Sequence, residues 1–182
     1  MAMNDPQRVI ADYLCEPARV LSDLTISRGQ ARIISGGFGA RPETLRFVKV
    51  REIPGRQLHA VLFEDEQKQP QFFICYVVRD NLGHWHYRGG GGGSKCWGLV
   101  HNDQPSIHGS KEFPHDFFAG GYVPQPELDV ERVRLISQNG LVLEDTVQDG
   151  LVLFVTDQNV CAPIQAELYD HTSQLVAQHT LG

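Results

Sequence analysis

The sequence predicts a mainly β protein, α+β at most, in which one N-terminal helix packs on an antiparallel sheet. Three observations point to this class. Eighteen glycines and ten prolines among 182 residues supply the turns that many short strands require. From residue 30 onward, apolar and polar residues alternate with a period of two, and turn residues separate these runs. Hydrophobic residues make up 41% of the chain, which is enough for a packed core.

The first element is predicted to be a helix. Asp5 can cap the free amide groups of its first turn, and Pro6 suits the first helical position. Apolar residues then recur on one face, and Pro17 interrupts or restarts the helix. The residues of this pattern are Val9, Ile10, Tyr13 and Leu14, followed by Val20, Leu21 and Leu24. A short amphipathic helix is stabilised mainly by packing, so this helix should lie against a sheet.

The next region is predicted to be an antiparallel meander. After a first short run, "ARIIS", four strand-like runs follow with brief connections: "TLRFVKVREI", "LHAVLFED", "QFFICYVVRD" and "HWHYR". Short turns between such runs favour antiparallel neighbours. The run "QFFICYVV" is almost continuously apolar, so we expect it to be the central strand, buried on both faces.

Residues 89–126 form an irregular middle segment that begins with five consecutive glycines. Holding a glycine in an ordered element costs about 0.5 to 1 kcal/mol relative to alanine. Fixing all five would therefore consume a large part of a net stability of about 5 to 15 kcal/mol. The sequence favours a mobile, glycine-rich loop. The alternative is a backbone that must approach a ligand or another chain closely.

The C-terminal part is predicted to contain five short strands. Their sequences are "ERVRLIS", "LVLEDTV", "LVLFVTD", "IQAELYD" and "QLVAQHT". Turns about every ten residues are typical of a β-sandwich. The ending "ELYDHTSQLVAQH" resembles the last hairpin of many bacterial immunoglobulin-like modules, which implies immunoglobulin-like sandwich strands here. We expect a first region at 1–121 and an immunoglobulin-like region at 122–182, with one continuous core as the alternative.

Charge and composition limit the classes of partner and compartment. The net charge is −6, and residues 122–182 hold two Lys or Arg against nine Asp or Glu, which argues against a nucleic-acid partner. No apolar stretch approaches the ~18 to 20 residues of a membrane span, and no signal-like segment opens the chain. The four cysteines form no CxxC pair. A soluble protein in the cytoplasm, with reduced thiols, is therefore expected.

A metal site is one hypothesis for function. In "HWHYR", alternation places His84, His86 and Arg88 on one face of a strand and the aromatic residues on the other. Two such histidines can bind zinc or another divalent metal, with His101 as the third ligand and hydrolysis as the reaction. Asp103, His108 and His115 are alternatives to His101. The pattern resembles the cupins only at His-x-His. At this spacing, a structural or solvent-facing histidine pair is more frequent than a metal-binding pair.

A cysteine nucleophile is a weaker hypothesis. Cys96 follows the glycines and is next to Lys95, whose charge would favour the thiolate. His101 or His108 could then act as the base for acyl transfer. A cysteine beside Trp97 is more often a packing residue.

The absence of a strong catalytic motif favours a non-catalytic binding or protein-interaction domain without a cofactor. Exposed strand edges and the segment 89–122 should make its contacts. The expected partner is an unidentified protein or small ligand, including another copy of the chain in a homodimer, and not a nucleic acid or a membrane. The candidate contact residues are Arg88, Gly91, Lys95, Trp97 and Phe117.

Overall fold

The computed structural model of the chain describes residues 5–26, 29–94, 106–111, 116–123 and 129–181. Within them it is mainly β, with antiparallel strand pairs and one α-helix, which confirms the predicted class. The helix is α1 (Pro6–Cys15), and a short 3-10 turn, η1, spans Pro42–Thr44. The strands are β1 (Ala18–Ile26), β2 (Gly29–Gly36), β3 (Arg46–Ile53), β4 (Arg56–Glu64), β5 (Pro70–Arg79), β6 (Trp85–Ser94), β7 (Ser106–Lys111), β8 (Phe117–Tyr122), β9 (Val130–Ser137), β10 (Val142–Thr146), β11 (Leu151–Thr156), β12 (Ile164–Asp170) and β13 (Leu175–Leu181).

Helix α1 forms as the sequence predicts. The Asp5 carboxylate accepts a hydrogen bond from the Gln7 amide at 3.2 Å, and a proline lies in the first turn. The predicted continuation beyond Pro17 is wrong, because β1 and β2 pair there as an antiparallel hairpin. Pro17 disfavours helix before it, and the following stretch contains β-branched residues that suit a strand.

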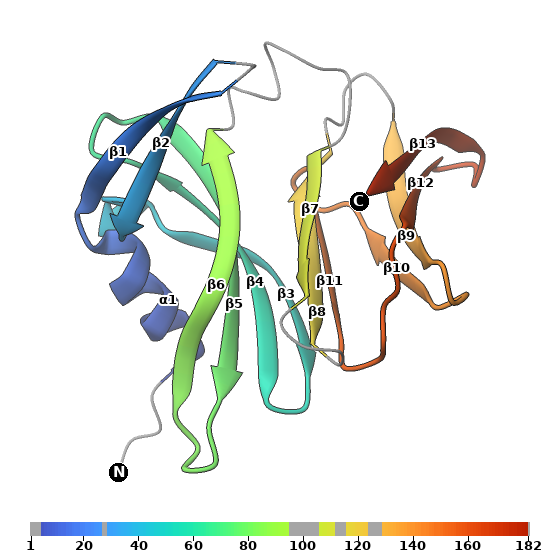
Figure 1. The fold of residues 1–182 in the computed structure, drawn as a ribbon, viewed down its shortest axis with the longest axis horizontal. Coiled ribbons are helices and arrows are strands. Elements are labelled where there is room, and N and C mark those ends of the chain that lie inside the picture. Colours follow the sequence, from blue (N-terminus) through green and yellow to red (C-terminus); the bar gives the residue numbers. More distant parts are fainter. Residues whose placement is uncertain (1–4, 27–28, 95–105, 112–115, 124–128, 182) are drawn as a thin grey trace.

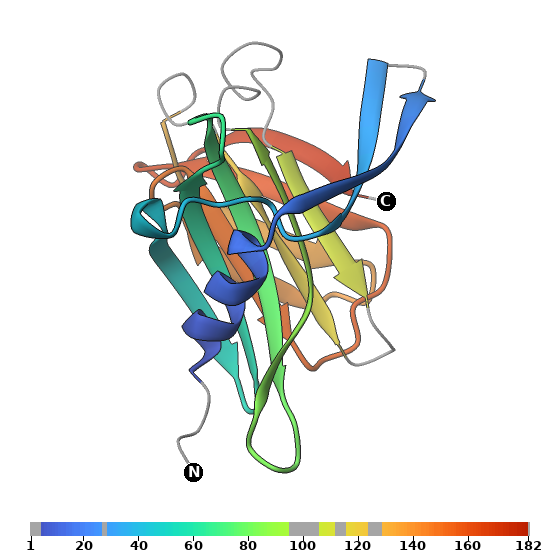
Figure 2. The same cartoon turned by 90° about the vertical axis from the view of Figure 1, so that its left-hand side faces the viewer.

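Strands β3, β4, β5 and β6 form the predicted antiparallel meander in that order. As predicted, β5 is an inner strand buried on both faces. Its residues Phe73, Cys75 and Val77 pack with Ile10 and Leu14 of α1. The intervening Ile74 and Tyr76 join a second core on the opposite face of the sheet. Figure 2 shows α1 lying across the meander.

A three-stranded sheet, in the order β11-β8-β7, lies on the face of the meander opposite α1 (Figure 1). Strands β8 and β11 bury side chains on both faces. Phe118 and Leu153 contact the core beneath the meander, whereas Phe117 and Phe154 belong to a third core on the far side. The segment predicted to be irregular thus contains the end of β6 and the strands β7 and β8. Strand β8 is buried because a sheet covers each of its faces.

The fourth layer is a sheet in the order β10-β9-β12-β13. The five predicted C-terminal strands are confirmed as β9 to β13. Four layers therefore follow one another: helix, meander, middle sheet and outer sheet (Figure 1). The predicted boundary between residues 121 and 122 falls within β8, which pairs with β11. Strands from both predicted regions thus share the middle sheet.

Candidate functional site

The five glycines lie in a strand, where the sequence favoured a mobile loop. They continue β6, and Gly89 to Gly93 oppose Tyr76 to Phe72 of β5. Strand β5 is held in place by packing on both faces, so its backbone provides a fixed partner for the glycine backbone. The hydrogen bonds of this ladder offset part of the entropy that the glycines lose.

Close packing explains why side chains are missing at alternate positions of β6. A Cβ atom on Gly90 would lie 2.0 Å from the Ile74 carbonyl oxygen and 2.9 Å from the Phe73 ring. A Cβ atom on Gly92 would lie 2.1 Å from the Phe72 carbonyl oxygen and 2.6 Å from the same ring. The Phe73 ring occupies the space that side chains at these two positions would need. At Gly91 nothing lies within 4 Å of such an atom.

The outer edge of β6 has no pairing partner among the described strands. Gly90, Gly91 and Gly92 are exposed. Unpaired strand edges attract other strands, and proteins usually protect them with charges, bulges or short length. The opposite edge, β3, has such protection, because it contains a bulge and bears Arg46, Lys49, Arg51 and Glu52. The glycine edge of β6 has neither charges nor side chains, so it is open to pairing.

Strand β3 is also fixed to the sandwich by a buried carboxylate. The side chain of Asp145 on β10 is fully buried, and its Oδ2 lies 2.7 Å from Lys49 Nζ. Arg51 bonds the other carboxylate oxygen, and the Leu153 amide donates to Oδ2 at 2.7 Å. Burial lowers the pKa of Lys49, an effect that Asp145 opposes. These contacts leave β6 as the open edge of the meander.

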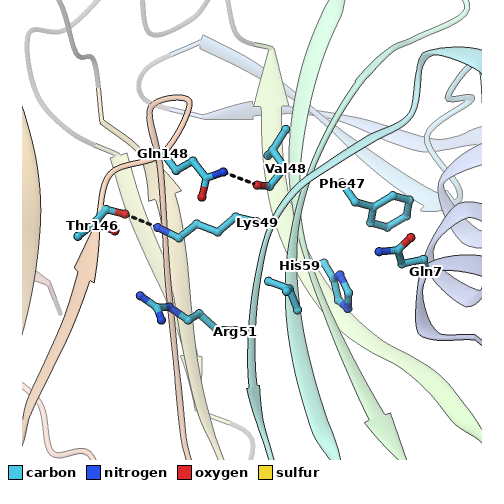
Figure 3. Close-up of a pocket in the computed structure, with 9 residues that line it drawn as sticks. Gln7, Phe47, Val48, Lys49, Arg51, His59, Thr146 and Gln148 are labelled. Atoms are coloured by element: carbon cyan, nitrogen blue, oxygen red, sulfur yellow. Dashed lines mark hydrogen bonds between the residues drawn. The ribbon is translucent and has the colours of Figure 1, made fainter.

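A cavity of about 440 Å³ runs along the edge of β3. Phe47, His59 and Gln7 lie on its α1 side, whereas Lys49 and Arg51 lie across the strand with residues of the β10–β11 connection (Figure 3). Its wall consists of Gln7, Phe47, Val48, Lys49, Val50, Arg51, His59, Thr146 and Gln148. The two cations already contact Asp145, so this cavity brings together no free charged group for catalysis.

His59 is buried and neutral. Desolvation by burial lowers its pKa to about 4. Its Nε2 lies 2.9 Å from Gln57 Oε1, while the Gln57 amide donates to Glu52 at 3.0 Å. Because Gln57 thus presents its oxygen, His59 must carry its proton on Nε2. The other ring nitrogen is buried without a hydrogen-bond partner. Sequence analysis missed His59, since one histidine in an apolar run carries no signal.

The His-x-His pair lies beside a carboxylate that sequence analysis also missed. Trp85 and Tyr87 pack in the core beside α1, while His86 and Arg88 are exposed. Asp80 Oδ2 lies 2.9 Å from His86 Nε2 and 3.7 Å from His84 Nδ1. The hydrogen bond from His86, together with backbone amides, lowers the pKa of Asp80 to about 2. The turn "RDNLGH" was the available signal, because Asp80 caps the amides of Leu82 and His84.

Among the described residues, no group of three or more His, Cys, Asp and Glu is arranged to hold a metal ion. Lys95, Cys96, Trp97 and His101 lie outside the described residues, so the acyl-transfer hypothesis and the third metal ligand stay predictions. Of the other predicted contact residues, Arg88 and Gly91 are exposed on β6. Phe117 is 5% exposed and packs between the middle and outer sheets.

The sequence matches no protein-family model, and the comparisons with curated proteins and with solved structures likewise give no match. Within the described residues, no helix has the length and apolar character needed to cross a membrane.

Proposed function

We propose that this chain is a non-catalytic protein-interaction domain that binds an extended segment of its partner along β6. The partner segment would add as a further strand and hydrogen-bond to the backbone of residues 89–93. One observation carries this proposal: the outer edge of β6 is exposed, unpaired among the described strands and free of side chains. Strand addition to a sheet edge is a common mode of peptide recognition.

The groups beside this edge support the same function. The Phe73 ring and α1 hold the glycine strand from within, so the edge is preformed and little ordering is needed on binding. Exposed Arg88 adds a cation at one end of the glycine run. Affinity would come from backbone hydrogen bonds and would tolerate different partner sequences.

We also propose that the sandwich behind the meander is immunoglobulin-like. Counted from β7 to β13, the first, second and fifth strands form one sheet, and the third, fourth, sixth and seventh form the other. Immunoglobulin constant-type domains divide seven strands in the same way, except that their fourth strand joins the first sheet. In this function the sandwich acts as a rigid support, since its middle sheet packs directly against the meander.

Selection of peptides from a random library, for binding to the purified protein, tests the function. A Gly91→Lys variant places a charge on the proposed edge, and the open space around Gly91 should accommodate it. A Gln178→Lys variant puts the same charge on the exposed edge strand β13 and serves as the control.

We expect selected peptides to bind the wild type and the control but to lose most of their affinity for Gly91→Lys. Hydrogen exchange of the amides in residues 89–93 should slow when a peptide binds. Equal binding to all three proteins, or protection confined to other strands, would contradict the proposal.

A metal site is the second candidate: Asp80 lies close to both His84 and His86, and the predicted further ligand, His101, would have to complete the site, because these three groups alone are not arranged to hold an ion. Elemental mass spectrometry of tag-free protein tests it. A content near one zinc, iron or manganese per chain would establish the site if the His84→Ala and His86→Ala variants each lose it. Absence of metal after incubation with zinc and desalting would refute it.

We propose a cytoplasmic location as well. In its support, the described cysteines Cys15, Cys75 and Cys161 are free thiols.

A further inference from the structure

The β1–β2 hairpin forms a two-stranded sheet of its own. Its strands pair with each other and, within the described part of the chain, with no other strand. An isolated two-stranded hairpin is at best marginally stable in water, and stability needs further strands or a packed face. The hairpin is therefore an arm that lacks its stabilising neighbour.

The register of this arm pairs residues of similar polarity for the most part. Asp23 opposes Arg32, and Leu24 opposes Ala31. The outer edge of each strand has no partner among the described strands. A hairpin with an open backbone edge is suited to extending another sheet.

The base of the arm is fixed, so that it projects from the molecule. The Phe38 amide, just after β2, donates to the Leu14 carbonyl of α1 at 3.1 Å, and the Gly39 amide donates to Glu16 at 2.9 Å. A Cβ atom on Gly37 would lie within 2.3 Å of the Tyr13 and Glu16 carbonyl oxygens, so the chain is tightly packed there. Figure 2 shows the hairpin extending away from α1 and the sheets.

We propose that the β1–β2 arm of a second copy of this chain pairs with the outer edge of β6. Two copies would exchange arms in this way. This inference rests on the proposed function, because it identifies the partner for the same edge. The four strands of the meander and the two of the incoming arm would form one six-stranded sheet. Exchange around a two-fold axis would satisfy both arms and both glycine edges, leaving none of these four features unpaired.

Sedimentation measurements over a range of protein concentrations test the proposal. We expect a monomer–dimer equilibrium for the wild type. Gly91→Lys blocks the edge of β6, and the double variant Leu24→Lys/Ile33→Lys places two charges on the arm. Each should raise the dimer Kd by about tenfold or more, whereas Gln178→Lys should leave it unchanged. Circular dichroism and thermal unfolding establish that each variant folds.

Mixing the two variants provides the sharpest test. Gly91→Lys keeps an intact arm and the double variant keeps an intact edge, so together they can form one of the two exchange contacts. Native mass spectrometry should detect this heterodimer at concentrations where each variant alone is monomeric. Hydrogen exchange of the amides in residues 89–93 tests the same contact in the wild type, without any substitution. Exchange should be slow at high protein concentration, where the edge is paired, and fast on dilution.

The results separate this inference from the proposed function. A wild type that stays monomeric, or a dimer that survives the arm substitutions, would overturn the arm exchange. If Gly91→Lys still abolishes the dimer or the binding of selected peptides, the β6 edge remains the binding site. If neither dimer nor peptide binding responds to Gly91→Lys, both proposals fail.

Discussion

At the scale of single residues, Asp145 shows how a buried charge joins two sheets. Its carboxylate receives two cations from β3 and one backbone amide from β11. A carboxylate removed from water is tolerated when its oxygens are paired and hydrogen-bonded in this way. Removing the carboxylate would leave Lys49, whose side chain is 7% exposed, without its counter-ion.

Asp145→Ala should lower the free energy of unfolding by about 3 to 5 kcal/mol, the usual cost of breaking a buried ion pair from one side. The matched control is Glu144→Ala, one residue away, where an exposed carboxylate contacts Arg132 at 3.0 Å. Its effect should stay below about 1 kcal/mol. Urea unfolding of both variants provides the comparison, and equal effects would show that Asp145 does not fix β3 to the sandwich.

His59 predicts a dependence of stability on pH. Its pKa is lowered from 6.5 to about 4 in the folded chain, so the unfolded chain binds more protons between these values. The stability contribution is therefore complete above pH 6.5 and decreases as the pH falls to about 4. At about 1.4 kcal/mol per pKa unit, the loss is at most about 3.5 kcal/mol.

Unfolding free energies measured from pH 7 to pH 4 test this assignment. His59→Leu should make the pH dependence shallower, because no buried imidazole then needs to be protonated. An unchanged slope in His59→Leu would contradict the assignment.

At the scale of elements, β6 shows that a strand can be specified by its neighbour. Glycine has low strand propensity, yet residues 89–93 pair throughout with β5. The cause lies in β5, whose apolar residues are buried on both faces and whose Phe73 ring lies over the glycine backbone.

Two alanine substitutions test this explanation. Gly90→Ala should destabilise the protein by about 1 to 3 kcal/mol, because its Cβ atom would overlap the Ile74 carbonyl oxygen. Gly91→Ala should be neutral or stabilising by up to about 1 kcal/mol, since open space surrounds that position and alanine restricts the unfolded chain. Thermal unfolding measures both. Equal effects would favour the mobile connection that the sequence suggested.

At the scale of the whole molecule, the middle sheet links all the β layers. It packs on the meander through one core and on the outer sheet through another. Strands from both predicted regions form it, because β7 and nearly all of β8 belong to residues 1–121, and β8 pairs with β11 of the second region. Separating the two regions would expose apolar surface on both.

We therefore expect one cooperative unfolding transition. In a Trp97→Phe background, the fluorescence of Trp85 reports on the core beside α1, while far-UV circular dichroism reports on all the strands. The two signals should change at the same urea concentration. Separate midpoints would instead support two domains that meet near residue 121.

The sequence by itself determined every element whose apolar pattern is local. Helix α1, the four meander strands and the five C-terminal strands follow from capping residues, periodicity and turns, which act over a few neighbouring positions. It also pointed to His84, His86, Arg88 and Gly91 as unusual, because their residue types stand out.

The tertiary structure alone decided which contacts distant segments of the chain make. The glycine run became a strand because β5 was fixed beside it, and the stretch after Pro17 became a hairpin because its two halves could pair. Asp145 acquired its role from cations that the fold brings to it from almost a hundred residues away. Propensity and periodicity describe a segment in isolation, whereas hydrogen-bond pairing and burial depend on contacts that form only when distant segments meet.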